Sequence, residues 1–355
     1  MQTKYYDGTK LLSLKDINGN TPEIYLCTSN RSAGKTTYFN RLLVRRFLKG
    51  QGKFCLLYRY SYELDDVANK FFKDIQGLFF PGYHMRSEKR SRGVYHELFL
   101  VNAAIEDDKG VSCGYAISLN SADMIKKLSH FFSDATIMLM DEFQSETNNY
   151  CSNELTKFKS IHNSIARGQG EQSRYLPVIM LSNPVTMLNP YYIGLGISSR
   201  LQENTKFLRG NGWVLEQGYV ESASQALKGS AFNQAFADDA YLSYASEGVY
   251  MNDNKAFIEK PDGIGKYIST IRFRGKDYGL RLYPEYGIVY CDDRPDQTFP
   301  EKYSVTTDDF NVNYVMLKSN DFFFQTLRYY FSHGCFRFKG LSEKEAIITA
   351  LGYRD

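Results

Sequence analysis

Apolar and polar residues alternate along the chain in one way before residue 205 and in another way after residue 250. In the first part, short apolar runs are separated by stretches with helical spacing, which predicts buried parallel strands joined by helices. The runs are residues 24–27, 53–60, 113–120, 135–140 and 176–183. This pattern predicts an α/β domain with a mainly parallel sheet.

The rest of the sequence divides into two further segments. Residues 206–250 are rich in small and polar residues, so we expect a small linker domain or helical connector there. From about residue 254 the pattern changes to alternating strands with turn residues between them, and helical spacing returns at 321–334 and 342–353. The predicted domains are residues 1–205, 206–250 and 251–355, the last with an α+β fold.

The stretch SNRSAGKTT, residues 29–37, follows the first apolar run and precedes a helical stretch. A strand, a loop of small residues and a helix N-terminus direct backbone N–H groups at a phosphate, as in the P-loop. In that motif Lys35 reaches the β- and γ-phosphates and Thr36 binds Mg²⁺. The motif normally opens with glycine, and Ser29 fits there only if the position does not need a positive φ. The alternative is a helix start that binds nothing.

The run ATIMLMDEF, residues 135–143, favours the nucleotide interpretation because it ends in two carboxylates. This is the Walker B pattern, in which Asp141 holds Mg²⁺ and Glu142 orients and polarises the attacking water. Strands also often end in solvated acids, but here both motifs occur in the expected order. Asn183 ends another predicted strand, at the position of a polar sensor of the γ-phosphate. Together the motifs predict a P-loop ATPase core of the ASCE type that uses ATP and Mg²⁺.

Composition places few further limits on function. The net charge is only +3, so any nucleic-acid contact must come from local basic patches. No apolar run reaches the roughly 20 residues that a membrane helix needs, and the N-terminus lacks the apolar core of a signal peptide. The six cysteines and five histidines show no metal-ligand spacing, so we expect neither a zinc site nor a disulfide framework.

Several segments without catalytic motifs match one family in the same order along the chain. They are YRYSYELDDVANKFFKDI (58–75), LSNPVTMLNPYY (181–192), AFIEK (256–260) and YSVTTDDFNVNYVML (303–317). With the two nucleotide motifs, they make the chain resemble the DNA-packaging ATPases of small protein-primed tailed phages, which are relatives of the large terminase motors. The resemblance implies a homo-oligomeric ring, a pentamer, in the host cytoplasm. Docked at the capsid portal, the ring would drive double-stranded DNA into the capsid by ATP hydrolysis.

The resemblance also implies roles for individual residues. Arg167 resembles the family's arginine finger, which acts on the site of a neighbouring subunit, and Lys127 resembles a second trans-acting cation, with Lys126 as the one-residue alternative. The alternative for Arg167 is a solvated arginine at a helix end. Gln169 stands where the family can carry another arginine, and Ser61 where a relative carries a lysine that faces the DNA channel. The expected nucleotide-binding residues are Ser29, Arg31, Gly34, Lys35, Thr36, Thr37 and Asn183, with Thr36 and Asp141 as metal ligands and Glu142 as the catalytic acid.

A basic segment, HMRSEKRSRG (84–93), lies between two predicted strands, residues 78–84 and 93–100. A basic hairpin tip can follow the phosphate backbone of DNA, which a packaging motor must hold without reading bases. The alternative is a solvated loop whose charges face water. The candidate DNA-contacting residues are Arg86, Lys89, Arg90 and Arg92.

The C-terminal domain raises a different possibility, because large terminases join an ATPase to a ribonuclease H-like nuclease with clustered carboxylates. The candidate acids are Asp277, Asp292, Asp293, Asp308 and Asp309. They resemble turn and cap residues rather than an acid cluster on a strand. We therefore expect a nuclease-dead ribonuclease H-like domain that docks to the portal, and to a structural RNA through a weak patch of Arg328, Arg337 and Lys339. An active nuclease, or another ring translocase or helicase, remains the alternative.

Overall fold

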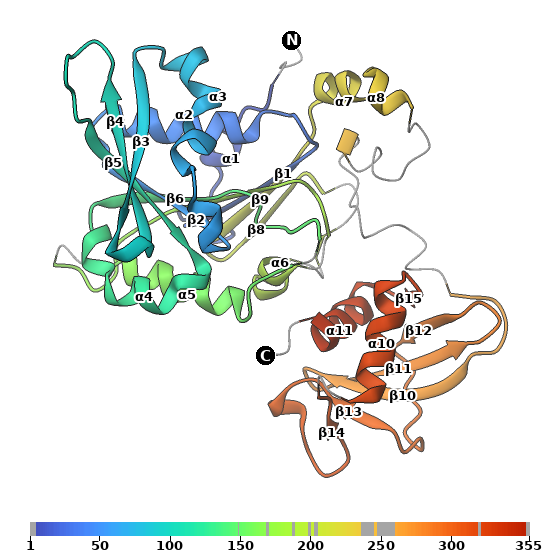
Figure 1. Cartoon of the computed structure of the whole chain (residues 1–355). Helices are drawn as coiled ribbons and strands as arrows, with labels where there is room; N and C mark the ends of the chain where they lie inside the picture. Colours follow the sequence, from blue (N-terminus) through green and yellow to red (C-terminus); the bar gives the residue numbers. More distant parts are fainter. Residues whose placement is uncertain are drawn as a thin grey trace. The chain divides into compact units, whose positions relative to one another are not determined.

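Two separate β-sheets organise the chain (Figure 1). The structure is a computed structural model that describes residues 5–147, 149–167, 170–186, 189–197, 200–201, 205–235, 245–246, 260–318 and 321–352. The chain forms two compact units, the first from residues 1–185 and 202–251 and the second from residues 186–201 and 252–355. In the described part of the chain, no helix is both long enough and apolar enough to cross a membrane.

The first unit contains a nine-stranded sheet. Its strands are β1 (Ile24–Ser29), β2 (Lys53–Tyr58), β3 (Tyr83–Arg90), β4 (Tyr95–Asn102), β5 (Val111–Ser118), β6 (Ala135–Met140), β7 (Val178–Ser182), β8 (Phe207–Gly210) and β9 (Trp213–Gly218). They lie in the order β3-β4-β5-β2-β6-β7-β1-β9-β8. Strands β5, β2, β6, β7, β1 and β9 run parallel, whereas β3, β4 and β8 pair antiparallel at the two edges. The predicted α/β class with a large, mostly parallel sheet is confirmed.

Helices cover both faces of this sheet (Figure 1). The described helices of this unit are α1 (Thr9–Ser13), α2 (Lys35–Leu48), α3 (Val67–Phe79), α4 (Ala122–Lys127), α5 (Glu154–Ile165), α7 (Glu221–Lys228) and α8 (Ala231–Gln234), with the short 3₁₀ turns η1 (Ser61–Leu64), η2 (Ser91–Gly93), η3 (Leu119–Ser121) and η4 (Ser129–Phe132). The central strands are almost continuously buried, as expected for parallel strands covered on both faces. The carboxyl ends of β1, β6 and β7 therefore meet at one edge, which positions the loops that follow them.

Three sequence expectations differ from this fold. Residues 206–218 are not part of a connector, because the apolar run that begins at Trp213 pairs with β1 and extends the main sheet. Residues 186–201 belong to the second unit rather than to the ATPase part of the chain. Leu78 and Phe79 end helix α3 instead of starting a strand, so β3 begins only at Tyr83.

The second unit contains a six-stranded sheet and three helices among the described residues. Its elements are α6 (Pro190–Gly194), β10 (Lys266–Phe273), β11 (Lys276–Tyr283), β12 (Ile288–Asp292), β13 (Lys302–Ser304), the 3₁₀ turn η6 (Thr307–Asp309), β14 (Val315–Met316), α10 (Phe322–Ser332), β15 (Phe336–Phe338) and α11 (Leu341–Gly352). The strand order is β14-β13-β10-β11-β12-β15. Helices α10 and α11 lie on one face, where Phe324, Leu327 and Ile347 pack with strand residues such as Leu280 (Figure 1). The expected segment 256–260 lies outside the described residues, except for Lys260.

Candidate nucleotide-binding and catalytic site

The loop between β1 and α2 turns by means of two left-handed residues. Ser32 has φ 58° and Gly34, the N-cap of α2, has φ 92°. Ser29 is the buried last residue of β1 and has no positive φ, so a side chain is tolerated where the usual motif has glycine. The loop thus delivers Lys35, Thr36 and Thr37 in the first turn of α2, where backbone N–H groups lack intrahelical partners.

Lys35 lies in the interior of the site. Its Nζ donates a hydrogen bond of 2.7 Å to Oδ1 of Asn183, which follows β7. Burial lowers the pKa of Lys35, and the nearby carboxylate of Asp141 opposes this shift. The loop lysine and the expected sensor, 148 positions apart in the sequence, therefore meet at the carboxyl edge of the sheet.

Thr36 and Asp141 form the second contact between the two motifs. The Thr36 hydroxyl donates to Oδ2 of Asp141 over 2.8 Å, at the end of β6. Burial raises the pKa of Asp141, while Lys35 and the Thr36 hydrogen bond lower it. A hydroxyl and one carboxylate suit Mg²⁺, which keeps several waters and needs few protein ligands.

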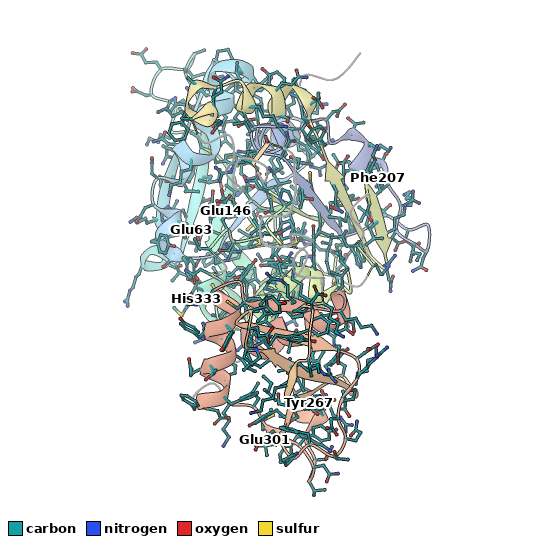
Figure 2. All side chains as sticks on the ribbon, turned by 90° about the vertical axis from the view of Figure 1, so that its right-hand side faces the viewer. Glu63, Glu146, Phe207, Tyr267, Glu301 and His333 are labelled. Carbon is teal, nitrogen blue, oxygen red and sulfur yellow. The ribbon has the colours of Figure 1, made fainter. Side chains whose placement is uncertain are left out.

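Glu142 follows Asp141 in a left-handed conformation, with φ 56°. Such a conformation is uncommon for a residue with a side chain and occurs often at functional sites. Partial burial raises the pKa of Glu142, as do Asp141, Glu146 and Glu63, while Arg31 opposes the shift. In Figure 2, Glu63 and Glu146 lie on the same side of the first unit, away from Phe207 on β8. The site thus gathers negative charge around Glu142.

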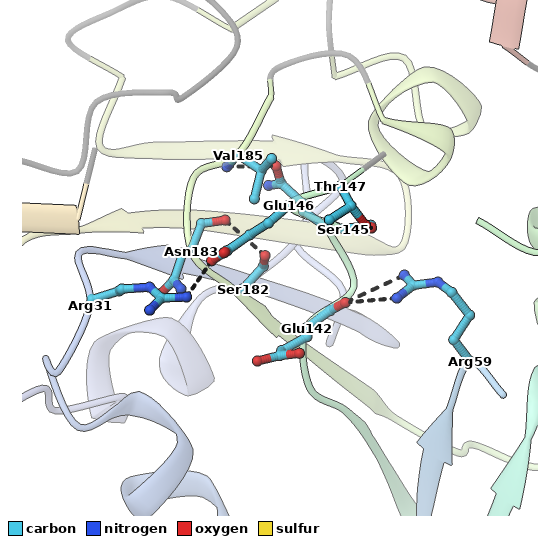
Figure 3. Close-up of a pocket in the computed structure, with 10 residues that line it drawn as sticks. Arg31, Arg59, Glu142, Ser145, Glu146, Thr147, Ser182, Asn183 and Val185 are labelled. Carbon is cyan, nitrogen blue, oxygen red and sulfur yellow. Dashed lines mark hydrogen bonds and ion pairs between the residues drawn. The ribbon is translucent and has the colours of Figure 1, made fainter. Parts of the chain in front are cut away.

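Two cavities adjoin these side chains. One, of about 300 Å³, is lined by Arg31, Ser32, Lys35, Thr36, Asp141, Glu142, Ser182 and Asn183. The other, of about 230 Å³, lies beside it and is drawn in Figure 3. It shares Arg31, Glu142, Ser182 and Asn183 with the first cavity and adds Arg59, the segment Gln144–Thr147 and Val185. Glu142 therefore borders both cavities.

Arg31 lies in the loop between β1 and α2 and lines both cavities. Its Nη2 lies 2.6 Å from Oε1 of Glu146, and its backbone N–H donates to the carbonyl of Ala245 (Figure 3). Both side chains of this ion pair are partly exposed, so the pair is expected to be weak and to break readily. Arg31 can therefore turn to a phosphate when one is bound.

Arg59 was missed in the sequence, although it follows an apolar strand and lies in one of the family-like segments. Its buried guanidinium binds both carboxylate oxygens of Glu154, the first residue of α5, at 2.8 and 3.1 Å. It also donates to the carbonyl oxygen of Phe143 at 3.0 Å and to that of Glu142 at 3.4 Å (Figure 3). Arg59 thus supports the backbone at Glu142.

The two expected trans-acting cations do not line either cavity. Lys127 is the exposed last residue of α4, and Arg167 lies exposed just after α5. Helices α4 and α5 pack against each other. Neither cation therefore completes the site of its own chain. Gln169 lies outside the described residues.

The basic segment forms a hairpin, but most of its charges are on a strand rather than at a tip. Arg86, Lys89 and Arg90 belong to β3, and only Arg92 lies in the turn, with φ 60°. Arg86 pairs with Glu88, Lys89 with Asp65, and Arg90 with both Glu88 and Glu97. The role of these residues in DNA binding stays a prediction, and three of the four already have acidic partners.

Four of the five candidate acids of the second unit have ion-pair or hydrogen-bond partners within that unit. Asp277 binds Arg272, Asp292 binds Arg281, Asp293 binds Lys339, and Asp309 accepts from the backbone of Arg274 and Gly275. Asp308 is exposed in η6. Among the described residues, no group of three or more His, Cys, Asp or Glu side chains is arranged to hold a metal ion.

Comparisons with known proteins agree with this site. Residues 1–350 match the model of the Podovirus DNA encapsidation protein (Gp16) family. The DNA packaging protein of Bacillus phage phi29 is 25% identical over 338 residues, covering 94% of this chain and 93% of the relative. That of Bacillus phage B103 is 24% identical over 291 residues, covering 81% and 83%.

Solved structures support the fold. A chain of the bacteriophage Phi-29 viral genome packaging motor assembly matches with a TM-score of 0.59 and 22% identity, covering 96% of both chains. A chain of the Phi-28 gp11 DNA packaging motor matches with a TM-score of 0.59 and 17% identity, covering 99% of both. The chain therefore belongs to the Podovirus DNA encapsidation protein (Gp16) family, as its segments had suggested, and its function is the packaging of phage DNA.

Proposed function

We propose that this chain is the ATP-hydrolysing subunit of a ring-forming motor that moves double-stranded DNA into a preformed capsid. The observation that carries the proposal is the convergence of Lys35, Asn183, Thr36, Asp141 and Glu142 at one edge of the sheet. Strand β7 lies between β1 and β6 in the sheet, which supports the ASCE class of P-loop ATPases.

The side chains present fit ATP and Mg²⁺. The ammonium of Lys35 is buried, its pKa is lowered and its hydrogen-bond partner is a neutral amide, so a phosphate would supply a counter-charge at this position. Thr36 and Asp141 would hold Mg²⁺, which when bound offsets the negative charge of the β- and γ-phosphates. Ser29, Arg31, Gly34 and Thr37 complete the expected phosphate-binding loop.

Glu142 is the group that accepts a proton from water. Its pKa is raised by partial burial and by neighbouring carboxylates, which brings its basicity closer to that needed for general-base catalysis near neutral pH. The support of Arg59 for the carbonyl oxygens of Glu142 and Phe143 keeps this carboxylate oriented toward the adjoining cavity.

A ring is proposed because the only cations among the described residues that line the two cavities are Lys35, Arg31 and Arg59, and the Arg59 guanidinium is already bound to Glu154. Arg167 and Lys127, exposed near the ends of two packed helices, are available to a neighbouring subunit. An arginine supplied in trans increases the rate by about 10³–10⁵-fold where it has been measured. The family resemblance suggests a pentamer that docks at the portal in the host cytoplasm, with a structural RNA as a further partner, and the motor assembly matched above supports an oligomer.

The second unit is proposed to be a ribonuclease H-like domain that does not cleave DNA. Five of its six strands support this proposal, because the order β12-β11-β10-β13-β14, with three antiparallel strands followed by two parallel ones, resembles that of a ribonuclease H sheet; β15 adds a sixth strand beside β12. The paired carboxylates and the lack of a described acid cluster argue against the active-nuclease alternative. Docking to the portal and to RNA, through residues that include Arg328, Arg337 and Lys339, is the role that remains.

The proposal is tested by separating ATP binding from ATP turnover. Lys35→Ala should abolish binding of ATP, because the loop loses its interior cation. Glu142→Gln should keep binding and stop turnover, because an amide cannot accept the proton. Lys73→Ala, an exposed lysine on α3 without a described contact, serves as the matched control and should match the parent in both assays. Parental turnover by Glu142→Gln would show that another group is the base.

A further inference from the structure

The second half of helix α2 concentrates positive charge. Between Tyr38 and Lys49 the sequence contains Arg41, Arg45, Arg46 and Lys49 and no acidic residue. We call these four residues the α2 basic face. The chain as a whole carries only +3, so this helix holds more positive charge than the net charge of the entire protein.

The α2 basic face has no acidic partner among the described residues. Each basic residue of the β3 strand is paired with a carboxylate, whereas no ion pair or side-chain hydrogen bond involves any of the four α2 cations. Arg41 and Arg45, and likewise Arg45 and Lys49, stand four residues apart, and like charges at this spacing destabilise a helix. Repulsion from Arg45, together with burial, lowers the pKa of Arg41.

Two of the three arginines of the α2 basic face are held in place by their surroundings. The guanidinium carbon of Arg41 lies 4.1 Å from the ring centroid of Phe79, at the end of α3, which runs beside α2 (Figure 1). The Nε atoms of Arg41 and Arg46 are buried and have no hydrogen-bond partner. Side chains with fixed stems lose little further conformational entropy when their guanidinium groups bind an anionic ligand.

The helix dipole does not account for the whole face. Basic residues stabilise the last turn of a helix, which explains Arg45, Arg46 and Lys49 in part. Arg41 lies about two turns before the end of α2, beyond the range of that effect. The cluster also has more members than a C-terminal cap requires.

We propose that the α2 basic face contacts the phosphate backbone of the duplex DNA that is packaged. This inference rests on the proposed function, which makes duplex DNA the polyanion that the motor must hold. Arg41 and Lys49 are about 12 Å apart along the helix axis, and one DNA strand presents a phosphate every 3.4 Å of axis, so the face spans three to four phosphates. Arginine and lysine contacts to phosphate hold DNA without reading its sequence.

One consequence is that a single helix contacts both anions of the motor. Its first turn carries Lys35 and Thr36 at the ATP site, and its last two turns carry the α2 basic face. A rigid helix of 14 residues, about 21 Å long, therefore connects the nucleotide with the DNA.

The test compares two sets of charge removals in the full-length chain. One variant replaces all four residues of the α2 basic face by Gln, and a milder one changes only the exposed Arg45→Gln and Lys49→Gln. The matched control changes Arg86, Lys89, Arg90 and Arg92 to Gln, which removes the same formal charge. Binding to a 30-base-pair duplex DNA is measured by fluorescence anisotropy across a salt series, and thermal melting and ATP binding are measured on every variant.

The salt dependence gives the expected result. Each phosphate contact contributes about 0.9 to the slope of log K against log salt. The four-residue variant should flatten the slope by about 3, the two-residue variant by about 2, and the hairpin control by clearly less. ATP binding should stay at the parental value, because the four residues do not line the nucleotide cavities. The melting temperature of the two-residue variant should not fall, because the change removes repulsion between like charges.

Three results would overturn the inference. The first is a parental slope in the folded two-residue variant, and the second is an equal or larger change in the hairpin control. The third is a loss of binding to duplex RNA while binding to duplex DNA is unchanged, which would make the α2 basic face an RNA-binding site. A parent protein that bound ATP but no duplex DNA would contradict the proposed function as well as this inference. The three results above would contradict this inference alone, so the two failures are distinguishable.

Discussion

Asp141 and Glu142 in the first unit and Asp277 in the second unit are in opposite electrostatic conditions. In the first unit, burial raises the pKa values of Asp141 and Glu142. Nearby cations and hydrogen bonds do not fully offset this effect of burial. In the second unit, hydrogen bonds from Arg272, Tyr314 and Gln297 outweigh burial and lower the pKa of Asp277. The fold stabilises the charged form of a structural carboxylate such as Asp277. At a proposed functional site, the charged carboxylates lower the stability of the fold until a ligand or a neighbouring subunit supplies positive charge.

The largest effect is expected when the proposed external charge is removed. Arg167→Ala leaves Lys35, Asp141 and Glu142 intact, so ATP should bind at close to normal affinity while turnover falls by about 10³–10⁵-fold. The measurement is steady-state ATP hydrolysis by the assembled motor, with Arg92→Ala as an exposed-arginine control.

Mixed rings distinguish action in trans from action in cis. Arg167→Ala subunits combined with Glu142→Gln subunits should recover part of the hydrolysis, because some interfaces pair an intact Glu142 with an intact Arg167. Inactive mixed rings, verified by native mass spectrometry, would contradict the trans role and make Lys127 the leading candidate.

The next effect concerns Glu142 itself. Glu142→Gln should reduce turnover by about 10²–10⁴-fold, since the general base is lost. The same change should raise the melting temperature at pH 7, because it removes a charge that the fold disfavours. A lower melting temperature would mean that the carboxylate is compensated within its own chain, as Asp277 is.

The opposite effect is expected for Asp277. Its carboxylate accepts hydrogen bonds from Arg272 at 2.7 and 3.0 Å and from the Tyr314 hydroxyl at 2.8 Å. Asp277→Asn should therefore reduce the free energy of unfolding by roughly 2 kcal/mol, because a charged hydrogen-bond acceptor is lost. Chemical denaturation measures the change, and Asp308→Asn, on an exposed 3₁₀ turn, should have little effect.

The pH dependence of these two variants should also have opposite signs. The raised pKa of Glu142 makes its charge costly above that pKa, so the stability advantage of Glu142→Gln should shrink as pH falls through it. The lowered pKa of Asp277 makes its charge stabilising above the ordinary value of 3.8, so the defect of Asp277→Asn should shrink only below that pH. Melting curves between pH 7 and pH 3 test both trends, and differences that do not change with pH would remove the electrostatic explanation.

The smallest expected effect is on DNA cleavage. The full-length protein with Mg²⁺ or Mn²⁺ should leave plasmid DNA uncut, because four of the five candidate acids, Asp277, Asp292, Asp293 and Asp309, are engaged with arginine, lysine or backbone groups. Nicking that disappears in Asp292→Asn, Asp293→Asn would show that these acids can release their partners and bind metal.

Sequence patterns are reliable where the physical cause is local. The P-loop and the Asp141-Glu142 strand end were predictable because a phosphate site needs adjacent residues on a strand, a turn and a first helical turn. The tolerance of Ser29 could be stated as a condition on φ, and the structure meets that condition. The order of four family-like segments identified the family for a similar reason, since each is a continuous stretch of chain.

Contacts between distant segments could only come from the tertiary structure. The residues of the Lys35–Asn183 and Arg59–Glu154 pairs are 148 and 95 positions apart, and no periodicity connects them. The same reason explains why 206–218 looked like a connector, since its strands are completed only by pairing with β1. Charge shows the limit most clearly: the sequence determined that Arg86, Arg90, Arg41 and Arg45 are basic. Only the fold decided that the first two face carboxylates and the last two do not, because ion pairing depends on which side chains the packing brings within a few ångströms.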